Sequence, residues 1–337
     1  MKSIYQTRTP NPNVTWEVAK QLDFGIEGRL LSNRLSFEFD RFTERRSGIL
    51  YWRNASVPQT AGLSLPRENI GVVANRGWDG SISWRQQLES DVSFEATFNG
   101  GYAQNKILFW DEAPGAPPWQ QSTGFRMSTG LYYKAIGVFK DQAAVDAYPH
   151  WAGARPGDLI FEDVNGDGKI DANDRIRINQ NGDPTFTGGL NLAAQVKSFD
   201  FRVFFHAAFD AVQYFRTESG DIGNFTAEYA ANRWTPDNPN APGPRTFNRT
   251  DEYWVANANT YFLRDASFIR LKSVEIGYHV PSRMAARMGV HDVRLYASGY
   301  NLFLWDQFRI LDPETRDSQG QYYPQQRVFN AGASVTF

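Results

Sequence analysis

The sequence predicts an all-β protein, an antiparallel transmembrane β-barrel with about nine strands and long extracellular loops. Apolar and polar side chains alternate along many short segments. These segments are joined by connections that are alternately short and long, and the last segment ends on an aromatic residue. A soluble β-sandwich shows the same alternation, so the connections and the last strand decide between the two folds.

The last segment, Val328–Phe337, has one apolar and one polar face at the two-residue period of a strand. Apolar residues stand two, four and eight positions before the terminal Phe337. This arrangement resembles the carboxy-terminal strand of outer-membrane barrel proteins. The alternative is a half-buried closing strand of a soluble sandwich.

Eight earlier segments show the same alternation and are bounded by residues typical of turns. We expect the turn from Pro281 to Gly289, after the seventh strand, to hold one helical turn. In chain order, the nine alternating segments lie at about 16–30, 35–40, 78–85, 92–102, 190–196, 199–205, 274–280, 293–299 and 328–337.

The connections differ in length in a regular way. Those after strands one, three, five and seven are short, whereas long ones cover about 46–75, 105–187 and 210–261, and about twenty residues precede the last strand. Loops longer than about 15 residues are uncommon in compact soluble domains. Outer-membrane barrels have short periplasmic turns and long outer loops, so the lengths favour a membrane barrel.

The charges predict which face meets lipid. Asp23 and Glu27 lie on the polar parity of the first strand. Turning these carboxylates to lipid would cost roughly a few kcal/mol, and a basic residue at the bilayer midplane costs about 2–4 kcal/mol. We therefore expect the Leu, Phe and Ile parity to face lipid and the other parity a wet lumen. Nine is an odd number of strands, and an open sheet edge does not occur in lipid. We expect residues 1–337 to be the carboxy-terminal part of a larger barrel, and Met1–Gln6 lacks the apolar core of a signal peptide.

Composition excludes several classes of protein. Lys and Arg number 35 against 37 Asp and Glu, so the chain has no basic footprint for nucleic acid. Cysteine is absent, which excludes a disulfide scaffold, a thiolate metal site and a cysteine nucleophile. No stretch reaches the roughly 20 apolar residues of a membrane helix. The aromatic content of 15 % suits sheets and interfaces.

The segment Asp163–Asp174 fits the twelve-residue calcium loop, with Gly168 at the sharp turn. Calcium prefers six to eight oxygen ligands, so the spacing predicts a structural Ca²⁺ site, weak at roughly 10⁻⁴–10⁻³ M. Neither flank is predicted to be helical, which excludes a sensor pair. The alternative is a tight turn without an ion. The predicted ligands are Asp163, Asn165, Asp167, the carbonyl of Lys169, Asp171 and Asp174.

Catalytic patterns are absent from the sequence, and we predict that the protein is not an enzyme. The four histidines lack ligand spacing, and no metalloprotease, nucleophile-elbow or phosphate-loop motif is present. The pair Asp111 and Glu112 would suit a glycosidase, but we interpret it as solvated loop charge.

The tryptophans fall into two groups. Those in loops either stack on sugar rings or pack the loops together, and packing is the favoured interpretation; they are Trp110, Trp119, Trp151, Trp234 and Trp254. Those near strand ends are predicted to form an interfacial girdle, and they are Trp16, Trp78, Trp84 and Trp305.

Several segments, in their order and spacing, resemble the SusC/RagA family of TonB-linked outer-membrane proteins, the large importers of the Bacteroidetes. The segments are Asn11–Glu17, Phe161–Ile170, Arg233–Pro239, Phe262–Lys272, Gly277–Pro281, Asn301–Phe303 and Asp312–Glu314. The resemblance implies a plugged barrel of roughly 22 strands, of which this chain is the last portion. It also implies a SusD-like surface lipoprotein as a lid, energy from the TonB complex, and glycan or peptide cargo. The signal peptide, accessory domain, TonB-contacting segment and plug would lie outside this chain.

The sequence therefore favours nutrient import in the outer membrane of a Gram-negative cell, in contact with lipid. The alternative is a soluble, extracellular, calcium-braced β-sandwich that binds carbohydrate. A secreted glycan hydrolase is a third interpretation, and it requires an acidic pair that is essential for sugar release.

Overall fold

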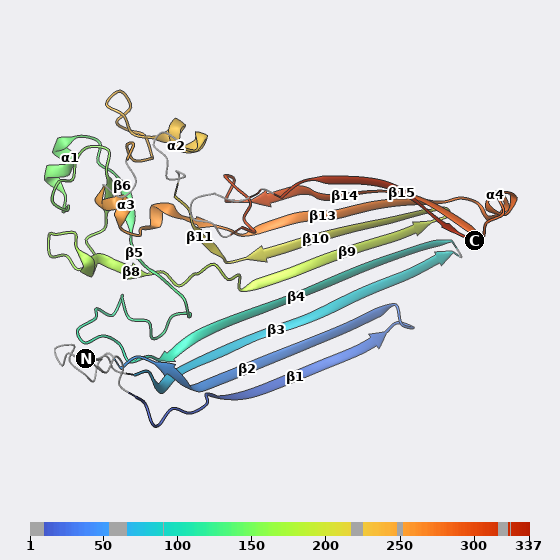
Figure 1. The fold of residues 1–337 in the computed structure, drawn as a ribbon, viewed down its shortest axis with the longest axis horizontal. Helices are drawn as coiled ribbons and strands as arrows, with labels where there is room; N and C mark the ends of the chain where they lie inside the picture. Colours follow the sequence, from blue (N-terminus) through green and yellow to red (C-terminus); the bar gives the residue numbers. More distant parts are fainter. Residues whose placement is uncertain are drawn as a thin grey trace, which may run out of the picture.

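A computed structural model describes residues 10–53, 66–89, 91–216, 225–247, 252–315, 323 and 325–337. Its main element is one antiparallel sheet of nine strands in the order β1-β2-β3-β4-β9-β10-β13-β14-β15 (Figure 1). Each of these nine strands pairs with the strand of the sheet that comes just before or just after it along the chain. The nine predicted strands are confirmed, and within the described residues β1 and β15 form the two edges.

The strands of this sheet are β1 Val18–Leu30, β2 Leu35–Tyr51, β3 Glu68–Glu89, β4 Val92–Phe109, β9 Phe186–Val196, β10 Phe199–Phe209, β13 Phe268–His279, β14 Asp292–Asp306 and β15 Val328–Thr336. Three small sheets pair β5 Leu131–Tyr133 with β8 Arg175–Arg177, β6 Ala135–Val138 with β7 Leu159–Phe161, and β11 Val212–Tyr214 with β12 Leu263–Asp265. The helices are α1 Gln142–Ala147, α2 Ala227–Asn232, α3 Tyr253–Ala256 and α4 Ser282–Arg287, with 3₁₀ turns η2 Ala172–Asp174 and η3 Thr260–Phe262.

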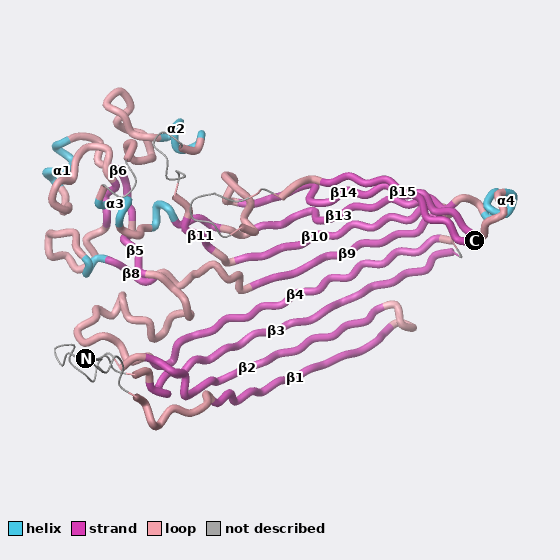
Figure 2. Tube along the Cα trace, viewed as in Figure 1, coloured by secondary structure: helices cyan, strands magenta, loops and turns pink. Residues whose placement is uncertain are grey.

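Short turns gather at one end of the sheet and long connections at the other, as Figure 2 shows. The turn between β1 and β2 is tight because Leu31, Ser32 and Asn33 all adopt positive φ, at 53°, 56° and 66°. The turn between β13 and β14 contains α4, so the predicted helical turn is confirmed.

Several strands extend further toward the loop end than predicted. The expected connection at 46–75 is wrong at both ends, because β2 continues to Tyr51 and β3 begins at Glu68; residues 54–65 lie outside the described residues. The register of β2 against β3 shifts at Ser47 and again at Ile49, and Gly48 has a φ of 72°. A bulge reverses the parity of the residues beyond it, so the apolar alternation stops before the strand does.

The strand register divides the sheet into an apolar and a polar face. One row of residues crosses all nine strands with apolar or small side chains, and it consists of Leu30, Leu35, Trp84, Ala96, Leu192, Val203, Val274, Gly299 and Phe329. The adjacent row, on the opposite face, is largely polar: Arg29, Ser36, Ser83, Thr97, Asn191, Phe204, Ser273, Tyr300 and Val328.

The apolar face is exposed and not packed against a second sheet. Leu22 is 71 % exposed, Phe24 69 % and Ile82 47 %. The only other sheets among the described residues are the three two-stranded ones in the connections. A β-sandwich would bury these side chains between its two layers, so the sandwich alternative does not fit this structure.

The main buried cluster lies in the long connections, which form a loop cap at one end of the sheet (Figure 1). We define the cap as residues 110–181, 225–247 and 252–262. Its core is largely aromatic, and it consists of Tyr133, Trp151, Leu159, Phe161, Ile170, Tyr229, Phe247, Trp254, Val255 and Phe262. No helix among the residues described is long and apolar enough to cross a membrane.

We predict that Ile82→Arg destabilises the protein in a phospholipid vesicle by about 2–4 kcal/mol, because it places a cation on the apolar face. The matched control, Ser81→Arg, puts the same cation on the polar face one residue earlier and should cost less. Urea unfolding of the vesicle-inserted, full-length protein measures both. Equal losses would contradict the assignment of the two faces.

Candidate functional site

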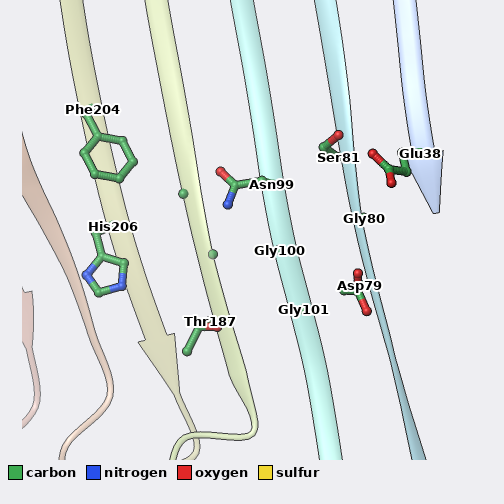
Figure 3. A pocket seen from close by; sticks show the side chains of 12 residues that line it. Glu38, Asp79, Gly80, Ser81, Asn99, Gly100, Gly101, Thr187, Phe204 and His206 are labelled. Carbon is green, nitrogen blue, oxygen red and sulfur yellow. The ribbon is translucent and has the colours of Figure 1, made fainter. Parts of the chain in front are cut away.

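The polar face of the sheet contains a hollow of about 490 Å³ (Figure 3). Strands β4 and β9 contribute glycines here, which have no side chain to fill the hollow. Gly101 lines the hollow, and so does Gly189, where an added Cβ would stand 2.8 Å from the Phe204 ring. The side chains around the hollow are carboxylate, hydroxyl, amide and imidazole groups. They are those of Glu38, Asp79, Ser81, Asn99, Thr187 and His206.

These groups suit a polar, hydrogen-bonding ligand. Glu38 and Asp79 lie on one side of the hollow and His206 on the other, with Asn99 and Thr187 between them (Figure 3). Hydroxyl and amide groups both donate and accept hydrogen bonds, whereas ionised carboxylates only accept them. The sequence analysis did not identify this site, because its residues come from five strands and only the register brings them together.

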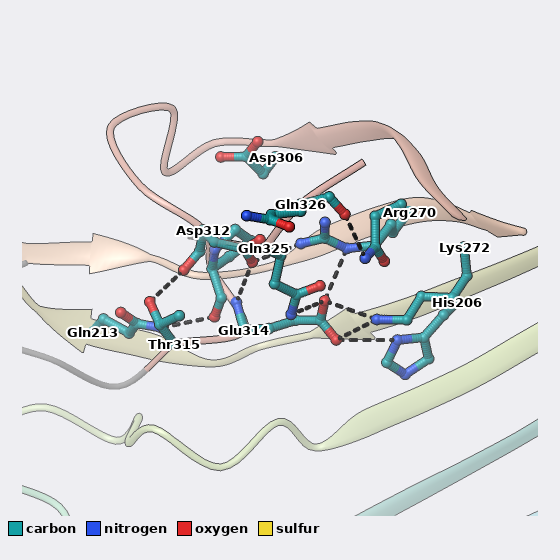
Figure 4. Close-up of polar contacts among 12 residues, drawn as sticks. His206, Gln213, Arg270, Lys272, Asp306, Asp312, Glu314, Thr315, Gln325 and Gln326 are labelled. Carbon is teal, nitrogen blue, oxygen red and sulfur yellow. Dashed lines mark hydrogen bonds and ion pairs between the residues drawn. The ribbon is translucent and has the colours of Figure 1, made fainter. Parts of the chain in front are cut away.

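Beside the hollow, the segment after β14 folds back onto the polar face (Figure 4). Arg270 of β13, whose side chain is only 4 % exposed, lies 2.6 Å from Asp312 and 2.8 Å from Glu314. Lys272 also contacts Glu314, at 3.3 Å. Gln213 donates a hydrogen bond of 2.7 Å to the carbonyl of Pro313.

This ion cluster connects the segment to the hollow. Nδ1 of His206, which lines the hollow, is 3.7 Å from Oε1 of Glu314. Two of the segments that carry the family resemblance, Phe262–Lys272 and Asp312–Glu314, therefore meet here. The sequence alone assigned them no role, since they are about 40 residues apart in the chain.

We predict that Arg270→Ala costs about 3–5 kcal/mol of stability, because it leaves two carboxylates without their buried partner. Lys134→Ala is the control: it breaks an exposed pair with Glu162 at 2.7 Å and should cost about 0–1 kcal/mol. Chemical denaturation of the full-length protein compares the two variants. Similar values would show that the cluster does not hold the segment.

A second ion network ties the two long connections of the loop cap together. Oδ1 of Asp158, whose side chain is 1 % exposed, accepts hydrogen bonds from Nε of Arg245 at 2.7 Å and Nε1 of Trp254 at 3.0 Å. Arg245 and Arg155 both bind Glu252, at 2.5 and 2.7 Å. Burial raises the pKa of Asp158, against the opposing charge of Arg245.

The pKa of Glu252 shifts the other way. Burial acts to raise it, but hydrogen bonds from Arg245 and Arg155 outweigh burial and hold the pKa of Glu252 below its ordinary value of 4.5. A carboxylate with a lowered pKa stabilises the fold above its unfolded pKa and loses that contribution as the pH falls.

We therefore predict that the Glu252 contribution to cap stability is fully present above about pH 4.5 and is lost below it. Glu252→Gln should remove this part of the pH dependence and make the cap easier to cleave at neutral pH. Limited proteolysis between pH 3 and 7, in roughly one-unit steps, follows the change. An unchanged pH profile in the variant would exclude Glu252 as the source.

The loop tryptophans pack the cap. Trp254 and Trp151 are 0 % and 7 % exposed, and Trp151 stacks on Tyr253 with ring centroids 4.9 Å apart. Trp110 is 8 % exposed and stacks on Tyr51 at 4.2 Å. The packing interpretation is confirmed for Trp151 and Trp254, whereas Trp110 packs against strands β2, β3 and β4. The indole N–H groups of Trp119 and Trp234 donate to the carbonyls of Asn173 and Lys140, respectively.

The interfacial girdle stays a prediction, and three of its four tryptophans are exposed in the structure. Trp16, Trp84 and Trp305 are exposed, at 89 %, 40 % and 53 %. Trp78 lies in the middle of β3, next to Phe39, so its assignment to a strand end is wrong. The first third of β3 contains a bulge that interrupts the alternation of apolar and polar residues. The alternation therefore predicts a strand that starts only at Trp78.

Glu112 holds its loop together through hydrogen bonds and is not a solvated charge. Its Oε1 accepts hydrogen bonds from the backbone N–H groups of Ser122 and Thr123 at 2.8 and 2.7 Å, and from the Thr123 hydroxyl at 2.8 Å. The expectation of a solvated pair is wrong for this residue. Its oxygen is committed to the loop backbone, which does not suit a glycosidase acid.

The predicted calcium loop, Asp163–Asp174, forms a tight turn on its own backbone. Asp163 accepts hydrogen bonds from the N–H groups of Gly166 and Gly168 at 2.8 and 2.9 Å, and Gly168 has the positive φ, 79°, of a sharp turn. The fully buried Asp174 joins both ends of the loop by accepting from the N–H groups of Val164 and Asp171.

Three other predicted ligands also accept hydrogen bonds from the backbone of the same loop. Oxygens of Asn165, Asp167 and Asp171 accept from the N–H groups of Asp167, Lys169 and Asn173. Within the described residues, no three His, Asp or Glu side chains are grouped so that they could hold a metal ion. The site therefore stays a prediction.

Comparisons with known proteins agree with this architecture, an all-β chain built on one large antiparallel sheet. TonB-dependent receptor P3 of Formosa agariphila is 31 % identical over all of this chain, and TonB-dependent receptor P26 of the same organism is 28 % identical over 98 % of it. TonB-dependent receptor SusC of Bacteroides thetaiotaomicron is 23 % identical over 99 %. The chain spans 33–36 % of the length of these relatives. No family model matches it.

The chain is therefore homologous over its whole length to part of the TonB-dependent receptors, and SusC is one of these relatives. The resemblance to the SusC/RagA family is confirmed. The fold agrees, because the solved RagAB peptide transporter superimposes with a TM-score of 0.72 over 98 % of this chain and 36 % of its own, at 22 % identity.

Proposed function

We propose that this chain is the carboxy-terminal barrel wall of an outer-membrane receptor that imports a glycan or a peptide with energy from the TonB complex. The observation that carries the proposal is the apolar row that crosses all nine strands on an exposed face. Such a face is stable in lipid and not in water. The homologues are named as TonB-dependent receptors and not as enzymes, which supports transport over catalysis.

The cargo passes along the polar face, where the hollow between Glu38 and His206 offers hydrogen-bonding groups. Both sugar hydroxyls and peptide amides bind such groups, so this chemistry suits either cargo. The solved RagAB proteins are described as a peptide importer. For this chain we propose the broader class of cargo, an oligomeric nutrient that is either a glycan or a peptide.

The loop cap is the docking surface for the SusD-like lipoprotein. Its aromatic core and the Asp158–Arg245–Glu252 network make it a rigid platform at the end of the wall where the long connections gather. A rigid surface loses little conformational entropy when a partner binds. Co-purification of the full-length receptor with the lipoprotein, before and after cap disruption by Trp254→Ala, tests this assignment.

We predict that Ser81→Trp reduces uptake at least several-fold, because the indole fills the hollow. Ile82→Trp is the matched control, since the next residue of β3 lies on the apolar face and should leave uptake near normal. Uptake of labelled oligosaccharide and oligopeptide mixtures by cells carrying the full-length receptor identifies the cargo class. Normal uptake of both mixtures by the Ser81 variant would contradict the pathway.

The calcium loop, we propose, braces the cap with a weakly bound Ca²⁺. The donor set of carboxylates, an amide and a carbonyl suits a hard cation, although the turn also closes on its own hydrogen bonds. We predict binding heat at millimolar Ca²⁺ by calorimetry, and its loss in Asp163→Ala. The absence of heat in the unmodified protein would show that the turn closes without an ion.

A further inference from the structure

The short helix α4 (Ser282–Arg287) lies at the end of the sheet opposite the loop cap, next to the last residue of β15 (Figure 1). Ala285 is fully buried and faces the strands, because α4 packs against β14. At about 100° per residue, Met284 and Met288 then share one flank of the helical turn. Arg283 and Arg287 fall together on the side away from the strands.

Both methionines are exposed, Met284 at 56 % and Met288 at 58 %. The two arginines are exposed as well. From Pro281 to His291 the sequence contains no acidic residue. The turn is therefore a small amphipathic element with an apolar flank and a basic outer side.

This element continues the apolar face of the sheet. The N–H of His291 donates to the carbonyl of Thr336 at 2.7 Å, which fixes the end of the turn beside β15. Val293 of β14 pairs with Val335 on the apolar parity; Val293 is 8 % exposed, whereas Val335 is 43 % exposed. Phe337, two residues further on, is 87 % exposed.

We propose that α4 is a membrane-interface anchor that binds anionic phospholipid of the leaflet at the short-turn end. Met284 and Met288 enter the boundary between headgroups and acyl chains, and Arg283 and Arg287 contact lipid phosphate. Basic amphipathic helices bind anionic bilayers by this combination of buried apolar area and charge. Arginine reaches the headgroups while its stem covers apolar surface. The inference rests on the proposed outer-membrane location.

Site-directed spin labelling tests the anchor, and the absence of cysteine from these 337 residues makes it direct. The full-length receptor, with any cysteine elsewhere replaced, carries one label at Met284→Cys, Met288→Cys or Arg283→Cys. It is inserted into phosphatidylcholine vesicles with or without phosphatidylglycerol. Collision rates with oxygen, which concentrates in lipid, and with a water-soluble nickel chelate report the surroundings of each label.

We expect oxygen collisions to exceed nickel collisions several-fold at positions 284 and 288, and the reverse at 283. Phosphatidylglycerol should raise the oxygen-to-nickel ratio at 288, and the double variant Arg283→Gln/Arg287→Gln should remove that increase. Labels at 284 and 288 that meet the nickel chelate, or neither probe, overturn the anchor. A ratio at 288 that does not respond to phosphatidylglycerol overturns it as well.

A label at Ile82→Cys separates this inference from the proposed function. If position 82 is in lipid while 284 and 288 are in water, the anchor fails and the membrane wall stands. If position 82 is also in water, the proposed membrane location fails.

Discussion

The pairing register of the nine strands is the constraint on which the rest of the structure depends. Side chains alternate strictly across a strand, so a slip of one residue would move every apolar side chain of that strand to the polar face. The row from Leu30 to Phe329 stays apolar or small across eight successive pairings. The hollow and the ion cluster at Arg270 exist because the same register assembles the opposite row.

The nine-stranded sheet and the loop cap are stabilised by different interactions. The nine-stranded sheet has little buried core of its own within the described residues, apart from a small cluster around Val73, Ile107 and Trp110. The cap has the larger core and a buried ion network, as a water-soluble domain does. A strand wall that faces lipid needs no second layer, because the bilayer covers its apolar side.

The sequence allowed the strand count, the apolar face, the loop asymmetry and the α4 turn to be predicted, since each depends on local alternation or on turn residues. It did not reveal where β2, β3 and β4 end, because bulges near Gly48 and Val73 reverse the parity. It also missed the Arg270–Asp312 pair and the hollow, which depend on contacts between distant residues. Glu112 was misjudged for a similar reason: its partners lie ten residues further along a folded loop.

The length of β3 has a consequence for the shape of the wall. Its 22 residues extend about 73 Å at about 3.3 Å per residue, and a tilt of about 45° leaves about 50 Å along the membrane normal. The hydrocarbon layer is only about 30 Å thick. In the proposed membrane location, roughly 20 Å of β3 would therefore extend beyond the hydrocarbon layer, on the side of the loop cap, so the polar face would begin to guide a molecule before that molecule reached the depth of the lipid.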